Sequence, residues 1–185
     1  MVSVMSLAVP IVLSAVVVFL VSSVIHMALN YHNADYAVLP KEDEILETFR
    51  RLNVTPGDYV APYANSPESM KAPAYLEKMQ RGPGLVVTVW KTSHFNMGAT
   101  LGQWFVYLLV VSLFTGYVLS RVFPPDAHYM HVFRLASTVA FMGYALGMPQ
   151  ANIWYRKDWG STLRSMFDGL LYGLVTAGVF GWLWP

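Results

Sequence analysis

Residues 7–29, LAVPIVLSAVVVFLVSSVIHMAL, decide the fold, because they form a long apolar run without a charged residue. A helix of about 20 apolar residues is long enough to cross a ~30 Å hydrocarbon core. The preceding segment, residues 1–6, has no Lys or Arg, whereas a cleaved signal peptide carries basic residues there. We therefore predict that residues 7–29 form a retained transmembrane helix.

The composition agrees with a membrane protein. Of the 185 residues, 55% are hydrophobic and only 12% are charged, which is too apolar for a soluble domain of this length. A formal net charge of +1 gives no basic excess for binding nucleic acid. The chain has no cysteine, which excludes disulfides, thiolate metal sites and a cysteine nucleophile.

Three further apolar segments are long enough to span a membrane: residues 101–119, about 130–148 and about 163–184. Tryptophan and tyrosine side chains mark their ends, as in the aromatic belts of membrane proteins. The predicted fold is an all-α membrane protein, a bundle of four transmembrane helices. We expect three parts: the first helix (1–29), a small mixed α/β insert outside the membrane (30–97), and the other three helices (98–185).

The orientation follows from the distribution of basic residues. With four spans, residues 30–97 and 150–162 lie on one side of the membrane, and both termini lie on the other. Ten of the twelve Lys and Arg residues fall on the first side, counting Arg164 at the start of the last span. The positive-inside rule therefore predicts that the insert is cytoplasmic and that both termini lie outside.

The insert carries signals for short elements. Acidic residues follow Pro40 and basic residues precede Leu52, with apolar residues on one face between them, which predicts an amphipathic helix. A short helix is expected over residues 73–81. The β-branched run at 85–90 predicts a strand, and residues 59–60 are its best partner.

Small residues recur every fourth position on the last predicted span, and the second span repeats the spacing. Such ridges let helix backbones approach closely in lipid. The contact is expected either within the chain or with another subunit. The ridge residues are Gly169, Gly173, Ala177 and Gly181 on the last span, with Ser112 and Gly116 on the second.

Polar side chains inside spans are costly, which makes them functional candidates. Alternating topology brings six of them to the cytoplasmic leaflet, where Arg164 is the expected charge partner of Asp168, one turn away. The cluster is either a structural network or a site for a substrate, a quinone or a lipid headgroup. Its members are His26, Gln103, Gln150, Asn152, Arg164 and Asp168.

The five histidines do not predict a metal or haem site. His26 and His32 are six residues apart, which does not place them on one helical face, although a helix end between them could return His32, with Asp35 as a third ligand. His128 and His131 are expected on the opposite side of the membrane, and His94 lies in the insert. We therefore expect no cofactor and no metal.

The chain resembles a family of uncharacterised bacterial integral membrane proteins. No activity, cofactor or site residue follows from this resemblance, which implies only a small inner-membrane protein. The residues that carry it are Ser22-Ser23-Val24-Ile25-His26-Met27, Tyr31-His32, Asp35-Tyr36, Pro56-Gly57-Asp58-Tyr59, Met97-Gly98, Ile153-Trp154-Tyr155, Phe167-Asp168-Gly169-Leu170 and Phe180-Gly181-Trp182-Leu183-Trp184-Pro185.

No phosphate-binding loop, zinc-protease motif or nucleophile elbow is present in the sequence. With contact surface but no catalytic constellation, we expect a non-catalytic accessory or structural subunit of a larger bacterial membrane complex, such as a respiratory or photosynthetic one. Its expected partners are the lipid bilayer and other membrane subunits. The alternative is a small-molecule, quinone or lipid-binding membrane protein that uses the polar cluster.

Overall fold

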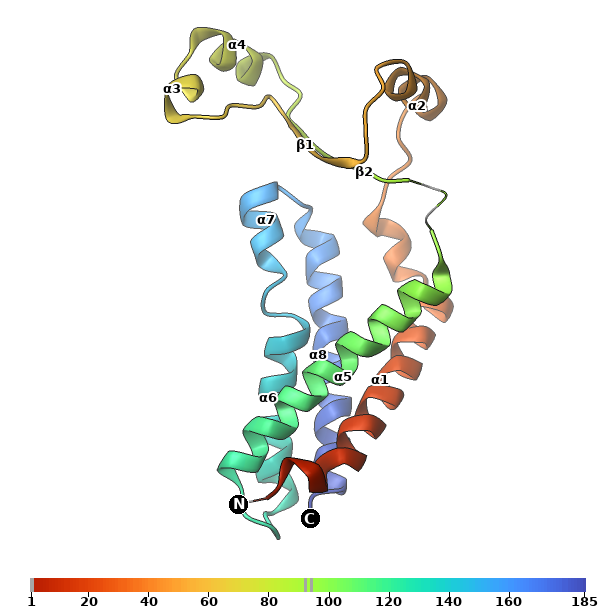
Figure 1. Ribbon diagram of the computed structural model, residues 1–185, viewed down its shortest axis with the longest axis vertical. Coiled ribbons are helices and arrows are strands. Elements are labelled where there is room, and N and C mark those ends of the chain that lie inside the picture. Colours follow the sequence, from red (N-terminus) through yellow and green to blue (C-terminus); the bar gives the residue numbers. More distant parts are fainter. Residues whose placement is uncertain (1, 92, 94) are drawn as a thin grey trace. The chain divides into compact units, whose positions relative to one another are not determined.

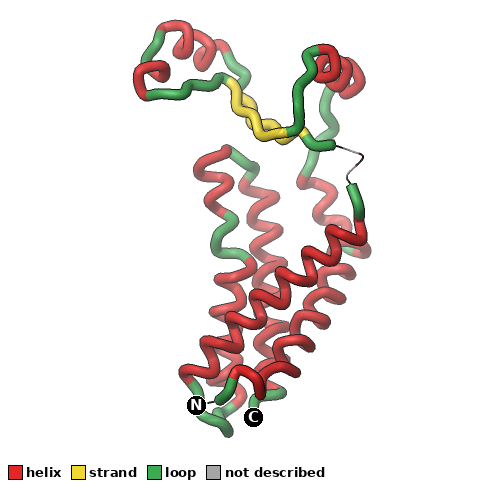
Figure 2. Tube along the Cα trace, viewed as in Figure 1, coloured by secondary structure: helices red, strands yellow, loops and turns green. Residues whose placement is uncertain are grey.

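The computed structural model describes residues 2–91, 93 and 95–185. The chain is mostly helical, at 71%, with one small two-stranded sheet (Figures 1 and 2). It divides into two compact units: a helical unit of Met1–Ala37 with Asn96–Pro185, and an inserted unit of Val38–Phe95. The insert is therefore shorter than predicted, because residues 30–37 group with the helices.

The helical unit consists of long helices joined by short turns. Asn96 begins α5 by accepting a hydrogen bond from the amide of Ala99 at 3.1 Å, and Asp158 begins α8 by accepting one from Ser161 at 2.8 Å. The elements are η1 (Val4–Leu7), α1 (Ala8–Ala28), η2 (Asn30–Asp35), α5 (Met97–Val122), α6 (Tyr129–Tyr144), α7 (Pro149–Tyr155) and α8 (Trp159–Trp182).

Among the described residues, two helical segments are long and apolar enough to cross a membrane, Val4–Ala28 and Met97–Val122. The predicted third span over 130–148 is not one continuous helix, because α6 ends at Tyr144. Pro149 has no amide hydrogen for the carbonyl of Ala145, and its ring collides with that carbonyl in a helix. The chain turns there and resumes as α7. With 16 residues, α6 is about 24 Å long at 1.5 Å per residue.

The small-residue ridge packs within the chain, mainly between α8 and α6. A Cβ atom added at Gly169 would lie 2.7 Å from the Cβ of Ala145, and one at Gly173 would lie 3.2 Å from backbone atoms of α6. Gly116 of α5 likewise faces Ile11 and Phe180. The sequence left open whether these glycines contact the same chain or another subunit. In the structure, other parts of the same chain pack against them.

Two apolar clusters form the core of the helical unit. One contains Leu7, Leu119 and Phe180, all fully buried, at the end where the two termini lie (Figure 1). The other contains Val18 and Leu108, deeper along the helices. The indole of Trp184 donates a hydrogen bond to the carbonyl of Pro124 at 3.0 Å, which ties the chain end to the α5–α6 turn.

The inserted unit has the elements that the sequence predicts. Strands β1 (Gly57–Ala61) and β2 (Leu85–Val89) pair antiparallel, with Tyr59 opposite Val87. The helices are α2 (Glu42–Arg51), α3 (Pro67–Met70) and α4 (Pro73–Arg81). None of the described side chains from Val38 to Phe95 is buried, so this unit has no core of its own.

Candidate polar site at the end of the helical unit

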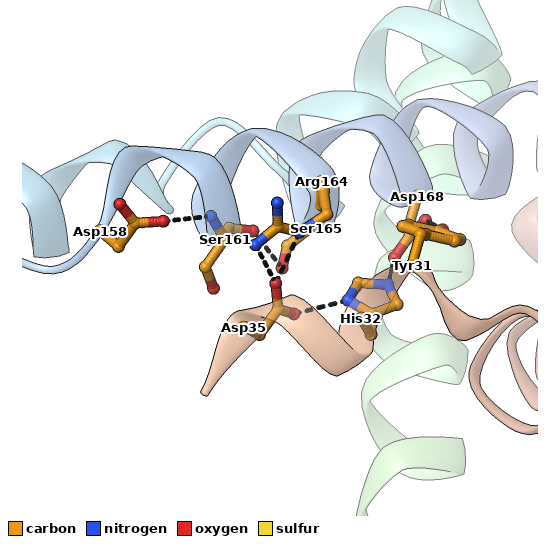
Figure 3. Close-up of polar contacts among 8 residues, drawn as sticks. All are labelled: Tyr31, His32, Asp35, Asp158, Ser161, Arg164, Ser165 and Asp168. Carbon is orange, nitrogen blue, oxygen red and sulfur yellow. Dashed lines mark hydrogen bonds and ion pairs between the residues drawn. The ribbon is translucent and has the colours of Figure 1, made fainter. Parts of the chain in front are cut away.

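The short helix η2 brings three polar side chains onto α8. Helix α1 ends at Ala28, Leu29 is extended, and the chain turns back as a 3-10 helix over Asn30–Asp35. A 3-10 helix has three residues per turn, so His32 and Asp35 lie on the same side. Figure 3 shows both side chains directed at α8, which presents Arg164 and Asp168 one turn apart.

A continuous chain of hydrogen bonds and ion pairs joins the five side chains (Figure 3). The guanidinium of Arg164 donates to Asp35 Oδ1 through Nε and Nη2, both at 2.6 Å. Asp35 Oδ2 lies 2.6 Å from His32 Nδ1, and His32 Nε2 lies 2.7 Å from Asp168 Oδ2. The hydroxyl of Tyr31 donates to the other oxygen of Asp168.

The sequence prediction that Arg164 pairs with Asp168 is wrong. Both residues lie on the face of α8 that meets η2, but the guanidinium reaches Asp35 instead. Asp168, which is only 2% exposed, is bound by His32 and Tyr31. The error arose because η2 contributes a second carboxylate that the sequence cluster did not contain.

The charges in the network support one another. Burial by itself raises the pKa of the Asp35 carboxyl, but hydrogen bonds from His32 and Arg164 outweigh it and hold that pKa below its ordinary value. Burial lowers the pKa of His32, yet hydrogen bonds to Asp35 and Asp168 raise it overall. Since both ring nitrogens of His32 face carboxylate oxygens, the imidazolium form donates a hydrogen bond from each. Burial, followed by the bond to Asp168, raises the pKa of Tyr31.

His26, in the last turn of α1, lies beside this network. Its ring centroid is 4.5 Å from that of His32. Ligand atoms of His26, His32 and Asp168 all lie within 4.8 Å of one another. The fold-back considered from the sequence, in which a helix end returns His32 to His26, therefore occurs. The third member of the group is Asp168, whereas Asp35 binds the far side of the His32 ring.

The other predicted members of the cluster lie elsewhere. Gln103 and Gln150 are exposed and contribute no side-chain hydrogen bond among the described residues. Asn152 is buried, but its amide donates to the carbonyls of Lys157 at 2.8 Å and Asp158 at 2.9 Å, so it closes the α7–α8 turn.

The remaining histidines do not join the site. His128 and His131 have ring centroids 5.8 Å apart on the α6 side of the α5–α6 turn, and His94 lies outside the described residues. The sequence prediction also missed Tyr31. No local signal in the sequence pointed to Tyr31, because a polar stretch after an apolar helix is typical of a connection.

Comparisons with protein-family models, with curated proteins and with solved structures gave no match. The resemblance to a family of bacterial membrane proteins therefore stays a prediction.

Proposed function

We propose that this protein is a four-span membrane protein that binds a cation at the polar network formed by η2 and α8. The observation that carries the proposal is the environment of Asp168. Its carboxylate is 2% exposed and contacts His32 and Tyr31, while the fixed positive charge of Arg164 contacts Asp35. Among the described residues, the positive charge beside Asp168 is the His32 imidazolium, whose proton a positively charged ligand can replace.

Membrane insertion is supported by the way apolar and polar side chains are distributed over the helices. On α1, the outward side chains are apolar, with Val9 64% exposed and Leu20 59% exposed. The inward positions include hydroxyl groups, and Ser14 donates to Ser112 across the interface at 3.0 Å. In water the outer face would be polar, whereas in lipid an apolar outer face with hydrogen bonds between helices is the stable arrangement.

The same distribution extends to α8, which we propose as the fourth span. Leu163, Phe167, Leu170 and Leu174 are exposed along one side, while Gly169, Gly173 and Ala177 are buried along another. Helix α6, continued by the turn and α7, is proposed as the third span, in which Pro149 interrupts the helix. Backbone groups freed by such a break are tolerated where they are buried in protein.

The orientation that we propose puts the cation site on the cytoplasmic side. The excess of Lys and Arg lies on the side that holds the insert, η2 and the beginning of α8. Both termini are then periplasmic, in the inner membrane of a bacterium. The site would exchange its ligand with the cytoplasm.

The accessory-subunit proposal is less well supported. It rests on the lack of a catalytic constellation and on contact surface offered by the small-residue ridges and the aromatic helix ends, but Gly169, Gly173 and Gly181 meet α6 side chains or backbone within this chain. Because these glycines are covered within the chain, they offer little surface to another subunit. The polar network is then the feature that most needs a function.

The orientation of the first two proposed spans is testable by chemical labelling, because the chain has no natural cysteine to interfere. Single cysteines are introduced as Ala74→Cys in the insert and Pro125→Cys in the α5–α6 turn, and intact cells are treated with a membrane-impermeant maleimide. We expect labelling of the Pro125→Cys variant and protection of the Ala74→Cys variant until the cells are opened. Equal labelling of both in intact cells would contradict the topology.

Cation binding is testable by thermal unfolding of the purified protein in detergent. The probes are Na⁺, Mg²⁺, Zn²⁺ and ethanolammonium at constant ionic strength. A ligand at 100 times its Kd stabilises the native state by about 2.7 kcal/mol, so a bound probe raises Tm. We expect at least one probe to raise the Tm of the wild type but not of Asp168→Asn.

The matched control is Asp158→Asn on the same helix, since Asp158 caps α8 outside the network and Asn caps equally well. We expect this variant to respond as the wild type does. The proposal is wrong if no probe stabilises the wild type, or if Asp168→Asn responds as strongly as Asp158→Asn.

A further inference from the structure

The arrangement of three side chains narrows the class of cation. We propose that His26, His32 and Asp168 coordinate a divalent transition-metal ion, an inference that rests on the proposed cation-binding function of this site. The three ligands come from the end of α1, from η2 and from the third turn of α8, and their ligand atoms lie within 4.8 Å of one another. The fold thus gathers residues that are far apart in sequence.

The donor atoms select the metal. Two imidazoles and one carboxylate are a typical ligand set for Zn²⁺ and for Fe²⁺, Co²⁺ or Ni²⁺. Mg²⁺ and Ca²⁺ need about six or more oxygen ligands, which this site does not supply. With no cysteine in the chain, soft thiolate coordination is excluded.

The surrounding hydrogen bonds are those that orient metal ligands. A histidine that binds a metal through one ring nitrogen usually donates from the other to a carboxylate, which fixes the ring. Here Asp35 Oδ2 binds His32 Nδ1 at 2.6 Å, and Arg164 fixes Asp35 in turn. This leaves His32 Nε2 directed at Asp168, and Tyr31 occupies the carboxylate oxygen of Asp168 that the metal would not use.

A small opening of the network would admit the ion. Two ligand atoms on a tetrahedral metal, each at about 2.0–2.1 Å, lie roughly 3.3 Å apart. His32 Nε2 and Asp168 Oδ2 are 2.7 Å apart and therefore separate by about 0.6 Å. His26 is exposed and makes no side-chain hydrogen bond among the described residues, so its ring is free to move toward the pair.

Metal binding replaces one proton on His32, and this exchange conserves charge and atoms. The metal ion takes the lone pair of His32 Nε2, and the proton on that nitrogen in the imidazolium form leaves to solvent. Three protein ligands leave a fourth position for water, which is the arrangement of an exchangeable or reactive site rather than a closed structural one. Metal affinity is therefore expected to fall as the pH falls.

The test uses full-length protein in detergent, purified with a tag that contains no histidine and freed of metal by a chelator. Binding of Co²⁺ is followed by its visible d–d absorption, which is stronger for sites without a centre of inversion, such as tetrahedral ones, than for octahedral ones. Binding of Zn²⁺ is followed by competition with a chromophoric chelator. We expect one ion per chain.

His26→Ala is the decisive variant, because His26 is exposed and takes no part in the hydrogen-bonded network. We expect it to weaken Zn²⁺ binding at least about tenfold and to lose the tetrahedral Co²⁺ spectrum. His32→Ala and Asp168→Asn should abolish binding, and Asp35→Asn should weaken it by about 10–100-fold through the loss of ring orientation. His131→Ala, also exposed but distant from the site, is the control and should bind as the wild type does.

The proposal is overturned if His26→Ala binds Co²⁺ and Zn²⁺ as the wild type does, or if only His131→Ala loses binding. If ethanolammonium or Na⁺ stabilises the wild type in an Asp168-dependent way and no transition metal binds, cation binding stands and the metal proposal falls. If none of these cations binds, both proposals fall.

Discussion

The two ends of the helical unit bury different kinds of side chain. At the end with the termini, Leu7, Leu119 and Phe180 are fully buried among apolar neighbours. At the other end, the buried Asp168 contacts an imidazole and a phenol, and the partly buried Asp35 contacts an imidazole and a guanidinium. An apolar side chain is satisfied by any close neighbour, whereas each buried charge requires one particular partner. The charged end is therefore the end at which a specific ligand can be recognised.

Removal of the Asp168 charge should have the largest effect on the free energy of unfolding. Asp168→Ala leaves the His32 imidazolium and the Tyr31 hydroxyl without their shared partner. Loss of one member of a buried ion pair costs about 3–5 kcal/mol. Denaturation of the purified protein in mixed detergents should show a loss of this size. Asp158→Ala, which removes only a helix cap, should cost about 1 kcal/mol; equal losses for the two variants would show that the network contributes no more than a cap.

Truncation of a buried side chain at the apolar end should lower the free energy of unfolding by less. Phe180→Ala removes a fully buried ring, a change that costs about 3–5 kcal/mol in water-soluble cores. Lipid competes for apolar contact, so we expect roughly 2 kcal/mol here, mostly from lost packing. The same variant should bind Zn²⁺ as the wild type does. Reduced Zn²⁺ affinity in Phe180→Ala would mean that the two ends are energetically coupled.

Between the two ends, the stability of the α6–α8 contact should depend on the size of the side chain at position 173. Gly173→Leu places a side chain where α6 backbone atoms lie 3.2 Å from the added Cβ, which costs about 1–3 kcal/mol. Gly178→Leu on the same helix is the control, because nothing lies within 4 Å of an added Cβ there. Both variants should insert, and only the first should lower Tm. A Tm loss shared by both would point to a contact with another subunit instead.

The smallest effect should be the pH dependence of the metal-free protein. The pKa of His32 is raised above its ordinary value of 6.5, so its stabilising contribution is complete below about pH 6.5 and is lost as the pH rises through the raised value. The pKa of Asp35 is lowered from 3.8, so its contribution is present above that pH and is lost in stronger acid. Tm should therefore be highest between these two limits, and His32→Gln should remove the alkaline decline. An alkaline decline that persists in His32→Gln must have another source.

Local signals in the sequence were sufficient to predict several helices and strands. The apolar run of residues 7–29 predicted the helical segment Val4–Ala28 within a few residues, and the β-branched run at 85–90 predicted β2 and its pairing with β1. These features depend on periodicity and composition over neighbouring residues. The break before Pro149 was also visible in principle, because proline cannot continue a helix.

The polar site depends on contacts that sequence does not show. Arg164 and Asp168 are one turn apart, so pairing within the helix was the natural prediction. The position of η2 decided the outcome, because it brought Asp35 to the guanidinium and His32 to Asp168. A connection of six residues carries no periodic signal, and its fold-back is set by the buried charges that it meets on α8. The sequence therefore allowed the return of His32 to His26, but it did not predict the pairing of His32 with Asp168 or of Arg164 with Asp35.

Native mass spectrometry of the full-length protein, extracted from its own membrane without chelators, would show whether the charged end holds a cation in the cell. We expect the wild type and Asp158→Asn to carry one additional cation per chain, and Asp168→Asn to carry none. Bare wild-type protein, or the same bound mass on Asp168→Asn, would contradict the assignment of this end of the molecule as a cation site.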